Sequence, residues 1–125
     1  MIRKRILIID DEDDIREVAQ VSLELVGDFE VLTATCGPDG VERARSGQPD
    51  AILLDVMMPD MDGPTTLAQL RSDPATQHIP VLFLTAKAQP VERARLAELG
   101  ADGILTKPFD PLKLAGEVAA ALRWN

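Results

Sequence analysis

The sequence has very few of the residues on which several kinds of chemistry depend. Its 125 residues include one cysteine, Cys36, one histidine, His78, and only 3% aromatic residues. A single cysteine excludes an internal disulfide and favours a reducing compartment. A nucleophilic cysteine would need a histidine partner, and His78 precedes Ile79-Pro80 in a predicted loop, so we assign Cys36 no catalytic role. With so few aromatic residues, the core must consist mainly of Leu, Ile, Val and Ala.

Long apolar segments and excess positive charge are also absent from the sequence. No apolar run approaches the roughly 18 residues needed to span a bilayer. The run after the basic start Arg3-Lys4-Arg5 is too short for a signal peptide. We therefore expect a cytoplasmic protein without membrane insertion. The formal net charge of −8 would repel phosphates, so direct binding to nucleic acid is not expected.

Short apolar runs alternate with helical patterns along the chain. The runs predict strands at 4–9, 30–34, 51–54, 81–84 and 103–106. The intervening patterns predict helices at 13–27, 38–46, 64–72, 90–99 and 111–123, the first of them capped by Asp13 and Asp14. This alternation is typical of an α/β fold in which helices cover both faces of a parallel sheet. The length suits one domain, and nothing in the composition marks a linker or a second domain.

Ionisable or hydroxyl side chains follow four of the predicted strands. Asp10 and Asp11 follow the first strand, and the others are Asp55, Thr85 and Lys107 after the third, fourth and fifth strands. The carboxyl ends of parallel strands meet at one edge of the sheet, where open α/β folds build their sites, so we expect these side chains to lie together. Three carboxylates, a hydroxyl and an ammonium predict a divalent metal beside an acceptor for a phosphoryl group.

The adjacent acids Asp10 and Asp11 favour a metal site, because two neighbouring carboxylates repel each other unless a cation lies between them. Carboxylate oxygens suit Mg²⁺, and Mn²⁺ accepts the same donors. Each residue alone also has a simpler explanation. The acids could serve a helix start, Asp55 a turn and Thr85 a cap, while Lys107 could be a solvated charge. The shared edge favours function, with Asp55 able to carry a phosphoryl group as an aspartyl phosphate.

Four segments carry a more specific signal. They are ILIIDDE at 6–12, LDVMMPDMDG at 54–63, PVLFLTAK at 80–87 and GADGILTKPF at 100–109. In this order they resemble the receiver domain of two-component response regulators, and the resemblance covers nearly the whole chain. It implies a flavodoxin-like, doubly wound (βα)5 fold with five parallel strands in the order 2-1-3-4-5, and a single receiver domain over residues 1–125.

The resemblance also implies how the carboxylates act. Asp55 accepts a phosphoryl group from a sensor histidine kinase or a phosphotransfer protein. Asp11 and Asp55 bind Mg²⁺ directly together with the backbone carbonyl of Met57, while Asp10 acts through a bound water. The chain is then a signalling switch in a phosphorelay and not an enzyme with a separate substrate. It catalyses only its own phosphoryl transfer and, in many family members, hydrolysis of its own phosphate.

The remaining implied roles fall on the later strands, where one residue departs from the family. Lys107 pairs with the acceptor and then with the phosphate, and its bond to Pro108 is usually cis. Thr85 turns to hydrogen-bond the phosphoryl group while an aromatic ring two residues before Thr106 turns inward. Here that position is Ile104, which is stiff and lacks a hydroxyl. We expect phosphorylation to be retained and output coupling to be altered.

Two residues beside the site bear on the lifetime of the phosphate in this family. Met57 is a poor group for positioning an attacking water, and Lys87 can shield the phosphate electrostatically. We therefore expect slow autodephosphorylation. Phosphorylation adds about −1.5 to −2 charges, which would bias the face made by the fourth helix, fifth strand and fifth helix toward a downstream protein or a homodimer. The charged residues of that face are equally compatible with a solvated surface; they include Glu92, Arg93, Arg95 and Glu98.

Three other functions fit part of the pattern. A binding module that is never phosphorylated would have no chemical reason to keep all five site residues. An Asp-nucleophile phosphohydrolase usually has a second Asp two residues after the nucleophile, where this chain has Met57, and a cap domain that encloses the substrate. A flavodoxin-like cofactor binder would need a hydroxyl-rich phosphate loop after the first strand, where this chain has acids. The sequence does not identify the kinase or the process controlled.

Overall fold

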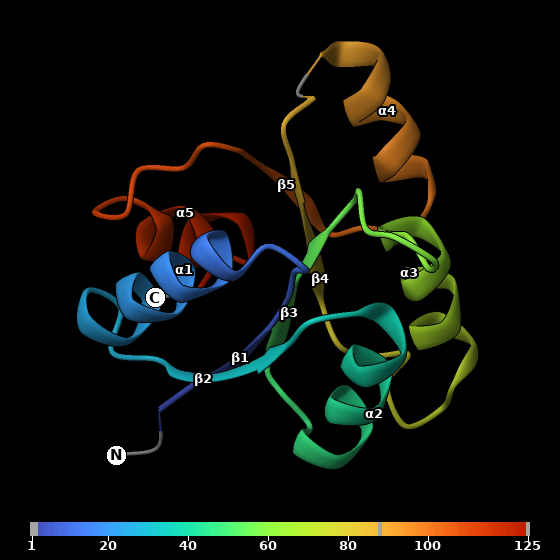
Figure 1. Ribbon diagram of the computed structural model, residues 1–125, viewed down its shortest axis with the longest axis horizontal. Coiled ribbons are helices and arrows are strands. Elements are labelled where there is room, and N and C mark those ends of the chain that lie inside the picture. The colour runs from blue at the N-terminus through green and yellow to red at the C-terminus, as the bar shows by residue number, and fades with distance from the viewer. Residues whose placement is uncertain (1–2, 88, 125) are drawn as a thin grey trace.

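The computed structural model describes residues 3–87 and 89–124. Within these residues strands and helices alternate as β1 (Arg5–Ile9), α1 (Asp13–Leu25), β2 (Glu30–Ala34), α2 (Gly37–Gly47), β3 (Ala51–Asp55), α3 (Gly63–Ser72), β4 (Val81–Thr85), α4 (Pro90–Glu98), β5 (Gly103–Thr106) and α5 (Leu114–Ala121). All pairings are parallel, and the strand order is β2-β1-β3-β4-β5. Helices α1 and α5 lie on one side of the sheet, and α2, α3 and α4 lie on the other (Figure 1). The expected flavodoxin-like α/β fold is confirmed.

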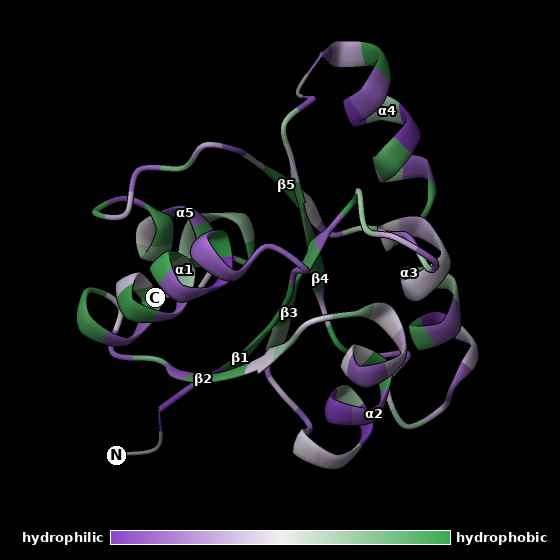
Figure 2. Ribbon diagram, viewed as in Figure 1, coloured by the Kyte–Doolittle hydropathy of each residue, from purple (hydrophilic) through white to green (hydrophobic). Residues whose placement is uncertain are grey.

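The central strands β3 and β4 are apolar up to their last residue because helices cover both of their faces. Every residue of β3 and β4 is buried. Successive side chains point to opposite faces, so Leu7 and Ile9 of β1 pack on the side of α2 and α3, while Ile6 and Ile8 pack against α1 and α5. Figure 2 shows mainly hydrophobic residues in the central strands and a mixture of hydrophilic and hydrophobic residues along the helices. The predicted strands therefore agree with the observed bounds to within one residue.

The start of α1 differs from the prediction. We expected Asp13 and Asp14 to cap this helix, but both lie in its first turn, and Glu12 occupies the N-cap position without a side-chain capping bond. The acids therefore act on the helix through its dipole, which favours negative charge near the N-terminus. The carboxylates before them are left free for another use.

The last helix is shorter than predicted. The pattern indicated a helix over 111–123, whereas α5 spans Leu114–Ala121. The chain first makes a turn in which the carboxylate of Asp110 accepts from the N–H of Leu112 at 2.9 Å. Asp side chains favour such turns over helix, which explains the late start. The Lys107-Pro108 bond before this turn is cis, as the family resemblance implied.

No helix in the described ranges is both long and apolar enough to cross a membrane. The expected cytoplasmic location stays a prediction.

Candidate functional site

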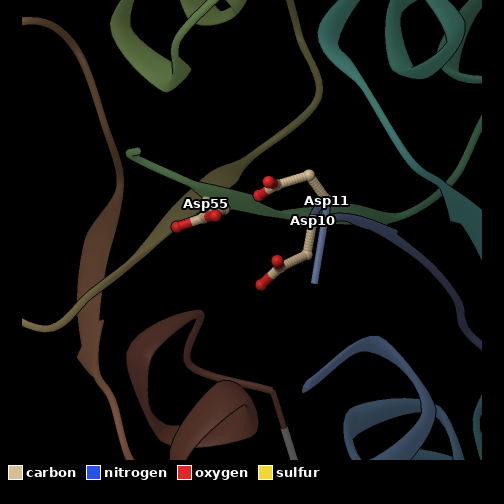
Figure 3. A group of neighbouring side chains, drawn as sticks. All are labelled: Asp10, Asp11 and Asp55. Carbon is tan, nitrogen blue, oxygen red and sulfur yellow. The ribbon is translucent and has the colours of Figure 1, made fainter. Parts of the chain in front are cut away.

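Three carboxylates meet at the carboxyl edge of the sheet. Figure 3 shows Asp10 and Asp11 leaving the chain at the end of β1 and Asp55 leaving it at the end of β3. Ile9 pairs with Leu54 in the parallel register, so the residues that follow them are neighbours. One oxygen from each carboxylate lies within 4.8 Å of the others. Asp10 and Asp55 are buried and Asp11 is exposed, so the cluster opens to solvent on the side of Asp11.

The ammonium of Lys107 lies between the buried acids. Its Nζ is 3.1 Å from Asp55 Oδ1, 2.9 Å from Asp10 Oδ2 and 3.3 Å from Glu12 Oε1. Lys107 directly follows β5, and its backbone N–H donates to the carbonyl of Thr85 at 2.8 Å. Its side chain is only 10% exposed. The end of β5 therefore brings one positive charge to the three carboxylates of Asp10, Asp11 and Asp55. The group of four side chains keeps a net negative charge when all of them are ionised.

Two buried carboxylate oxygens lack a hydrogen bond within the described residues: Asp10 Oδ2 and Asp55 Oδ2. The contact of Asp10 Oδ2 with Lys107 is an ion pair without the angles of a hydrogen bond. A buried acceptor left without a donor typically costs about 1–3 kcal/mol, more when it is charged. Hard oxygen donors with excess negative charge are what Mg²⁺ requires, and it needs only one or two carboxylates. The cluster of Asp10, Asp11 and Asp55 therefore fits a divalent metal.

The protonation of the two central groups follows from burial and charge. Burial, followed by the negative charge of Asp10, raises the pKa of Asp55 from 3.8 to about 6, against the opposing effect of Lys107. Burial lowers the pKa of Lys107, but the negative charges of Asp10 and Asp55, which lie 2.9 and 3.1 Å from its ammonium, outweigh burial, so the net shift is upward. Lys107 is therefore positively charged at neutral pH. Without a further cation, Asp55 binds a proton more readily than an ordinary carboxylate.

Thr85 ends β4, and Met57 follows Asp55 by two residues. The hydroxyl of Thr85, at the end of β4, accepts from the N–H of Lys87 at 3.0 Å and donates to the carbonyl of Lys87 at 3.3 Å. It is thus bound to the backbone of its own turn. The N–H of Met57 lies 3.4 Å from Asp55 Oδ1, and the Met57 side chain is 70% exposed. Both residues are where the sequence predicts them, but the Thr85 hydroxyl is not hydrogen-bonded to the carboxylates.

Gly63 allows the first turn of α3 to approach the backbone of the acceptor. A Cβ at this position would lie 2.4 Å from the carbonyl oxygen of Asp55 and 2.8 Å from the Cα of Val56. Both are backbone atoms and cannot move aside. The N–H of Gly63 donates to the carbonyl of Val56 at 2.9 Å, closing the loop that follows Asp55. Glycine is therefore required here by close approach.

Sequence reasoning missed two residues at the site. Glu12 pairs with Lys107, and Arg16 donates from Nη1 to the carbonyl of Asp10 at 2.9 Å and from Nη2 to Asp13 Oδ1 at 2.6 Å. The Asp13–Arg16 pair could have been anticipated, since residues three apart are neighbours on a helix. The bond to the Asp10 carbonyl has no signature in the sequence.

The chain matches the family model described as response regulator receiver domain over residues 6–119. It is 40% identical to the alkaline phosphatase synthesis transcriptional regulatory protein PhoP of Bacillus subtilis, over 98% of this chain and 50% of that protein. It is 44% identical to the DNA-binding dual master transcriptional regulator RpaA of Synechocystis sp., over 95% of this chain and 49% of that protein. The chain thus spans about half the length of these relatives.

Solved structures agree with the family match. The chemotaxis protein CheY4 of Vibrio cholerae has a TM-score of 0.88 at 30% identity, covering 96% of this chain and 99% of that one. The N-terminal domain of a response regulator receiver protein from Methanoculleus marisnigri has a TM-score of 0.77 at 36% identity, covering 97% and 98%. Fold, sequence and the acidic edge therefore agree, and this chain belongs to the receiver domains of two-component response regulators.

Proposed function

We propose that Asp55 is the residue that accepts the phosphoryl group, with Lys107, Thr85 and a metal bound near Asp10 and Asp11 as its partners. Phosphoryl acceptance on an aspartate is the general function of this family. The observation that supports Asp55 is its position: a buried carboxylate at the end of β3, 3.1 Å from the Lys107 ammonium, with a second oxygen that has no hydrogen bond within the described residues. Such an oxygen is open to a new bond.

The metal ligands proposed are the carboxylates of Asp11 and Asp55 and the backbone carbonyl of Met57, with Asp10 hydrogen-bonding a metal-bound water. Receiver domains generally bind Mg²⁺, and the three acids lie close enough to share one ion. Mg²⁺, or Mn²⁺ in its place, would offset negative charge on the phosphoryl group during transfer. The chain's own carboxylates orient the ion and keep it beside the acceptor.

The transfer itself is a substitution at phosphorus. A carboxylate oxygen of Asp55 forms a bond to phosphorus, while the bond from phosphorus to the donor breaks, at a histidine nitrogen of a kinase or an oxygen of acetyl phosphate. Lys107 stays within reach of Asp55 and pairs with the incoming phosphoryl oxygens. Thr85 has to give up the hydrogen bond that it donates to the Lys87 carbonyl before its hydroxyl can donate to the phosphoryl group. That exchange connects phosphorylation to the loop before α4.

We propose that the donor protein docks on a groove along α1. The groove has a volume of about 430 Å³, lies between α1 and the turn before α5, and is lined mainly by apolar side chains: Val18, Val21, Leu25, Val26, Pro111 and Leu112. Glu17 also lines it, and three further acids belong to α1: Asp13, Asp14 and Glu24. A donor helix with an apolar face and basic flanks would be complementary. Val21→Glu should block phosphoryl transfer from a histidine kinase that phosphorylates the wild type. The same variant should still be phosphorylated by acetyl phosphate. Equal loss of phosphorylation with both donors would contradict the proposed docking site.

The output surface proposed is the face made by α4, β5 and α5, which binds a downstream protein or a second copy of the chain. Val91 on α4 is 79% exposed, which suits such an interface. Ile104 on β5 is partly buried and packs on the core cluster beneath α4. Because a branched aliphatic side chain cannot swing like an aromatic ring, output coupling should differ from that of relatives with Tyr or Phe there. An Ile104→Tyr variant with unchanged dimerisation and unchanged amide chemical shifts after phosphorylation would contradict this.

The proposed acceptor can be tested by intact-mass spectrometry after incubation with acetyl phosphate. We expect one phosphoryl adduct on the wild type in the presence of Mg²⁺ and none in its absence or on Asp55→Asn. Asp60→Asn is the matched control, since Asp60 is an exposed acid of the neighbouring loop whose positive φ Asn tolerates. Its adduct should equal that of the wild type. Absence of any adduct would favour an unphosphorylated binding module.

The decay of the adduct measures autodephosphorylation. We expect a long-lived phosphate, because the exposed Met57 side chain has no group that positions an attacking water. Rapid decay of the wild-type adduct, equal to that of a Met57→Asn variant, would contradict this.

A further inference from the structure

We propose that Arg16 is a positioning residue for the metal site: it orients the Asp11 carboxylate and thereby increases affinity for Mg²⁺. Arg16 lies in α1, outside the cluster of carboxylates, and its side chain is 15% exposed. The proposal rests on the proposed metal site and adds a determinant of its affinity. It also explains why an arginine is held beside a group of acids that is meant to bind a cation.

The contacts of Arg16 fix the backbone on one side of Asp11. Its Nη1 donates to the carbonyl of Asp10 at 2.9 Å, which orients the peptide between Asp10 and Asp11. Its Nη2 donates to Asp13 Oδ1 at 2.6 Å, so the guanidinium is itself held in place. The peptide on the other side of Asp11 is fixed by the N–H of Glu12, which donates to Asp10 Oδ1 at 2.9 Å. Both peptides that flank Asp11 are therefore held.

This arrangement matters because Asp11 is the exposed member of the cluster. A buried carboxylate such as Asp10 is oriented by the packing around it, whereas an exposed one depends on its backbone for direction. Outer groups that orient a ligand typically change metal affinity by about 10- to 100-fold when removed. Arg16 meets that description through the Asp10 carbonyl and makes no contact that would occupy the carboxylate of Asp11 itself.

Two effects of Arg16 on the metal have opposite signs. The positive charge of the guanidinium repels Mg²⁺, so an effect of charge alone would make a neutral variant bind the ion more tightly. Loss of the two hydrogen bonds would loosen the peptide before Asp11, so a positioning effect would make the same variant bind more weakly. The sign of the change in affinity therefore distinguishes the two.

The experiment is calorimetric titration with Mg²⁺, supported by Mn²⁺ binding measured by electron paramagnetic resonance. We expect Arg16→Met, which keeps the apolar stem, to weaken Mg²⁺ binding roughly 10-fold. The affinity of Arg16→Lys should lie between those of the wild type and Arg16→Met, because lysine retains one donor group. Arg43→Met is the matched control: it removes the same charge from an exposed ion pair with Asp39 on α2 and should leave affinity unchanged or slightly higher.

Unchanged or tighter binding by Arg16→Met would overturn the proposal. A failure of the wild type to bind Mg²⁺ would instead overturn the proposed function. If Arg16→Met does not fold, Arg16→Lys tests the same link, because it keeps the positive charge but cannot make both hydrogen bonds of the guanidinium. Its affinity should fall, by less than that of Arg16→Met, and unchanged affinity would count against the proposal. Urea unfolding in EDTA separates a loss of general stability from a loss of metal affinity.

Discussion

The parallel strands have their amino ends at one edge of the sheet, the amino edge, and their carboxyl ends at the opposite edge, the carboxyl edge. These two edges use charged residues in opposite ways. At the amino edge, Arg71 donates to the carbonyls of Ile79 at 2.7 Å and Gly100 at 3.2 Å, and pairs with Asp102 at 3.1 Å. Asp102 also accepts from the N–H of Val81 at 2.8 Å, so the charges there are compensated. At the carboxyl edge, Lys107 pairs with three acids, Asp10, Glu12 and Asp55. Asp55 Oδ2 is one of the buried oxygens without a hydrogen bond in the described part of the chain.

This difference separates residues that stabilise the fold from residues kept available for a ligand. The bonds of Arg71 join α3, the chain before β4 and the chain before β5, so they hold elements together. The acids of the other edge repel one another, and the raised pKa of Asp55 is a measure of that repulsion together with burial. Substitutions should therefore reduce stability at one edge and change chemistry at the other.

The largest effect on stability is expected from Lys107→Met. This change removes the only cation within 4 Å of both Asp10 and Asp55 among the described residues and leaves two buried carboxylates uncompensated. Breaking a buried pair in this way typically lowers the free energy of unfolding by about 3 kcal/mol or more. Urea unfolding at neutral pH in EDTA measures the loss. Mg²⁺ should restore part of it, because a bound cation again offsets the acids.

The control for this prediction is Lys113→Met, which removes an exposed lysine just before α5 and should leave the unfolding curve nearly unchanged. A loss that is the same for both variants, or a loss from Lys107→Met that Mg²⁺ does not reduce, would contradict the view that the carboxyl edge is held together by compensation of its charges.

The second prediction concerns the pH dependence of the metal-free protein. The pKa of Asp55 is about 6 in the folded state against 3.8 for an ordinary Asp. Because the folded state binds this proton more tightly, its contribution to stability is fully present below the ordinary pKa and is lost as the pH rises through 6. At pH above 7, Asp55→Asn should therefore be more stable than the wild type in EDTA, by up to about 3 kcal/mol.

The difference between the two unfolding curves isolates Asp55. Asp62 has a lowered pKa because Thr65 hydrogen-bonds its carboxylate, and its contribution is lost as the pH falls, but it is common to both proteins. A difference that does not change between pH 4 and pH 8 would show that the environment of Asp55 is not the source.

Much of this fold and of the candidate site could be predicted from the sequence. Strands buried on both faces appear as continuous apolar runs, so β3 and β4 were predicted to within one residue. Parallel strands end at a common edge, which is why Asp10, Asp55 and Lys107 could be placed together before any contact was known. Both inferences depend only on strand direction and burial.

The rest could not be predicted, because it depends on individual bonds. The bond from Arg16 to a backbone carbonyl has no side-chain partner that a sequence would show. The Thr85 hydroxyl can rotate, and its hydrogen bonds to the backbone of Lys87 follow from the fold of the loop, not from the residue type. The late start of α5 results from the turn at Asp110, which competes locally with helix. The pKa of Asp55 is raised to about 6 mainly because its carboxylate is buried, and the spacing of residues in the sequence does not show how deeply a side chain is buried.

The smallest effect is expected at the amino edge. Arg71→Met should lower the free energy of unfolding by about 1–2 kcal/mol, since the carbonyl of the buried Ile79 loses a donor, while the exposed carboxylate of Asp102 can be hydrated instead. Arg43→Met removes an exposed pair and should change it by less than about 0.5 kcal/mol. Phosphorylation by acetyl phosphate should be unchanged in both variants. If Arg71→Met remained folded but formed no phosphoryl adduct, the two edges would be coupled. Residues of the amino edge would then affect the chemistry as well as the stability of the protein.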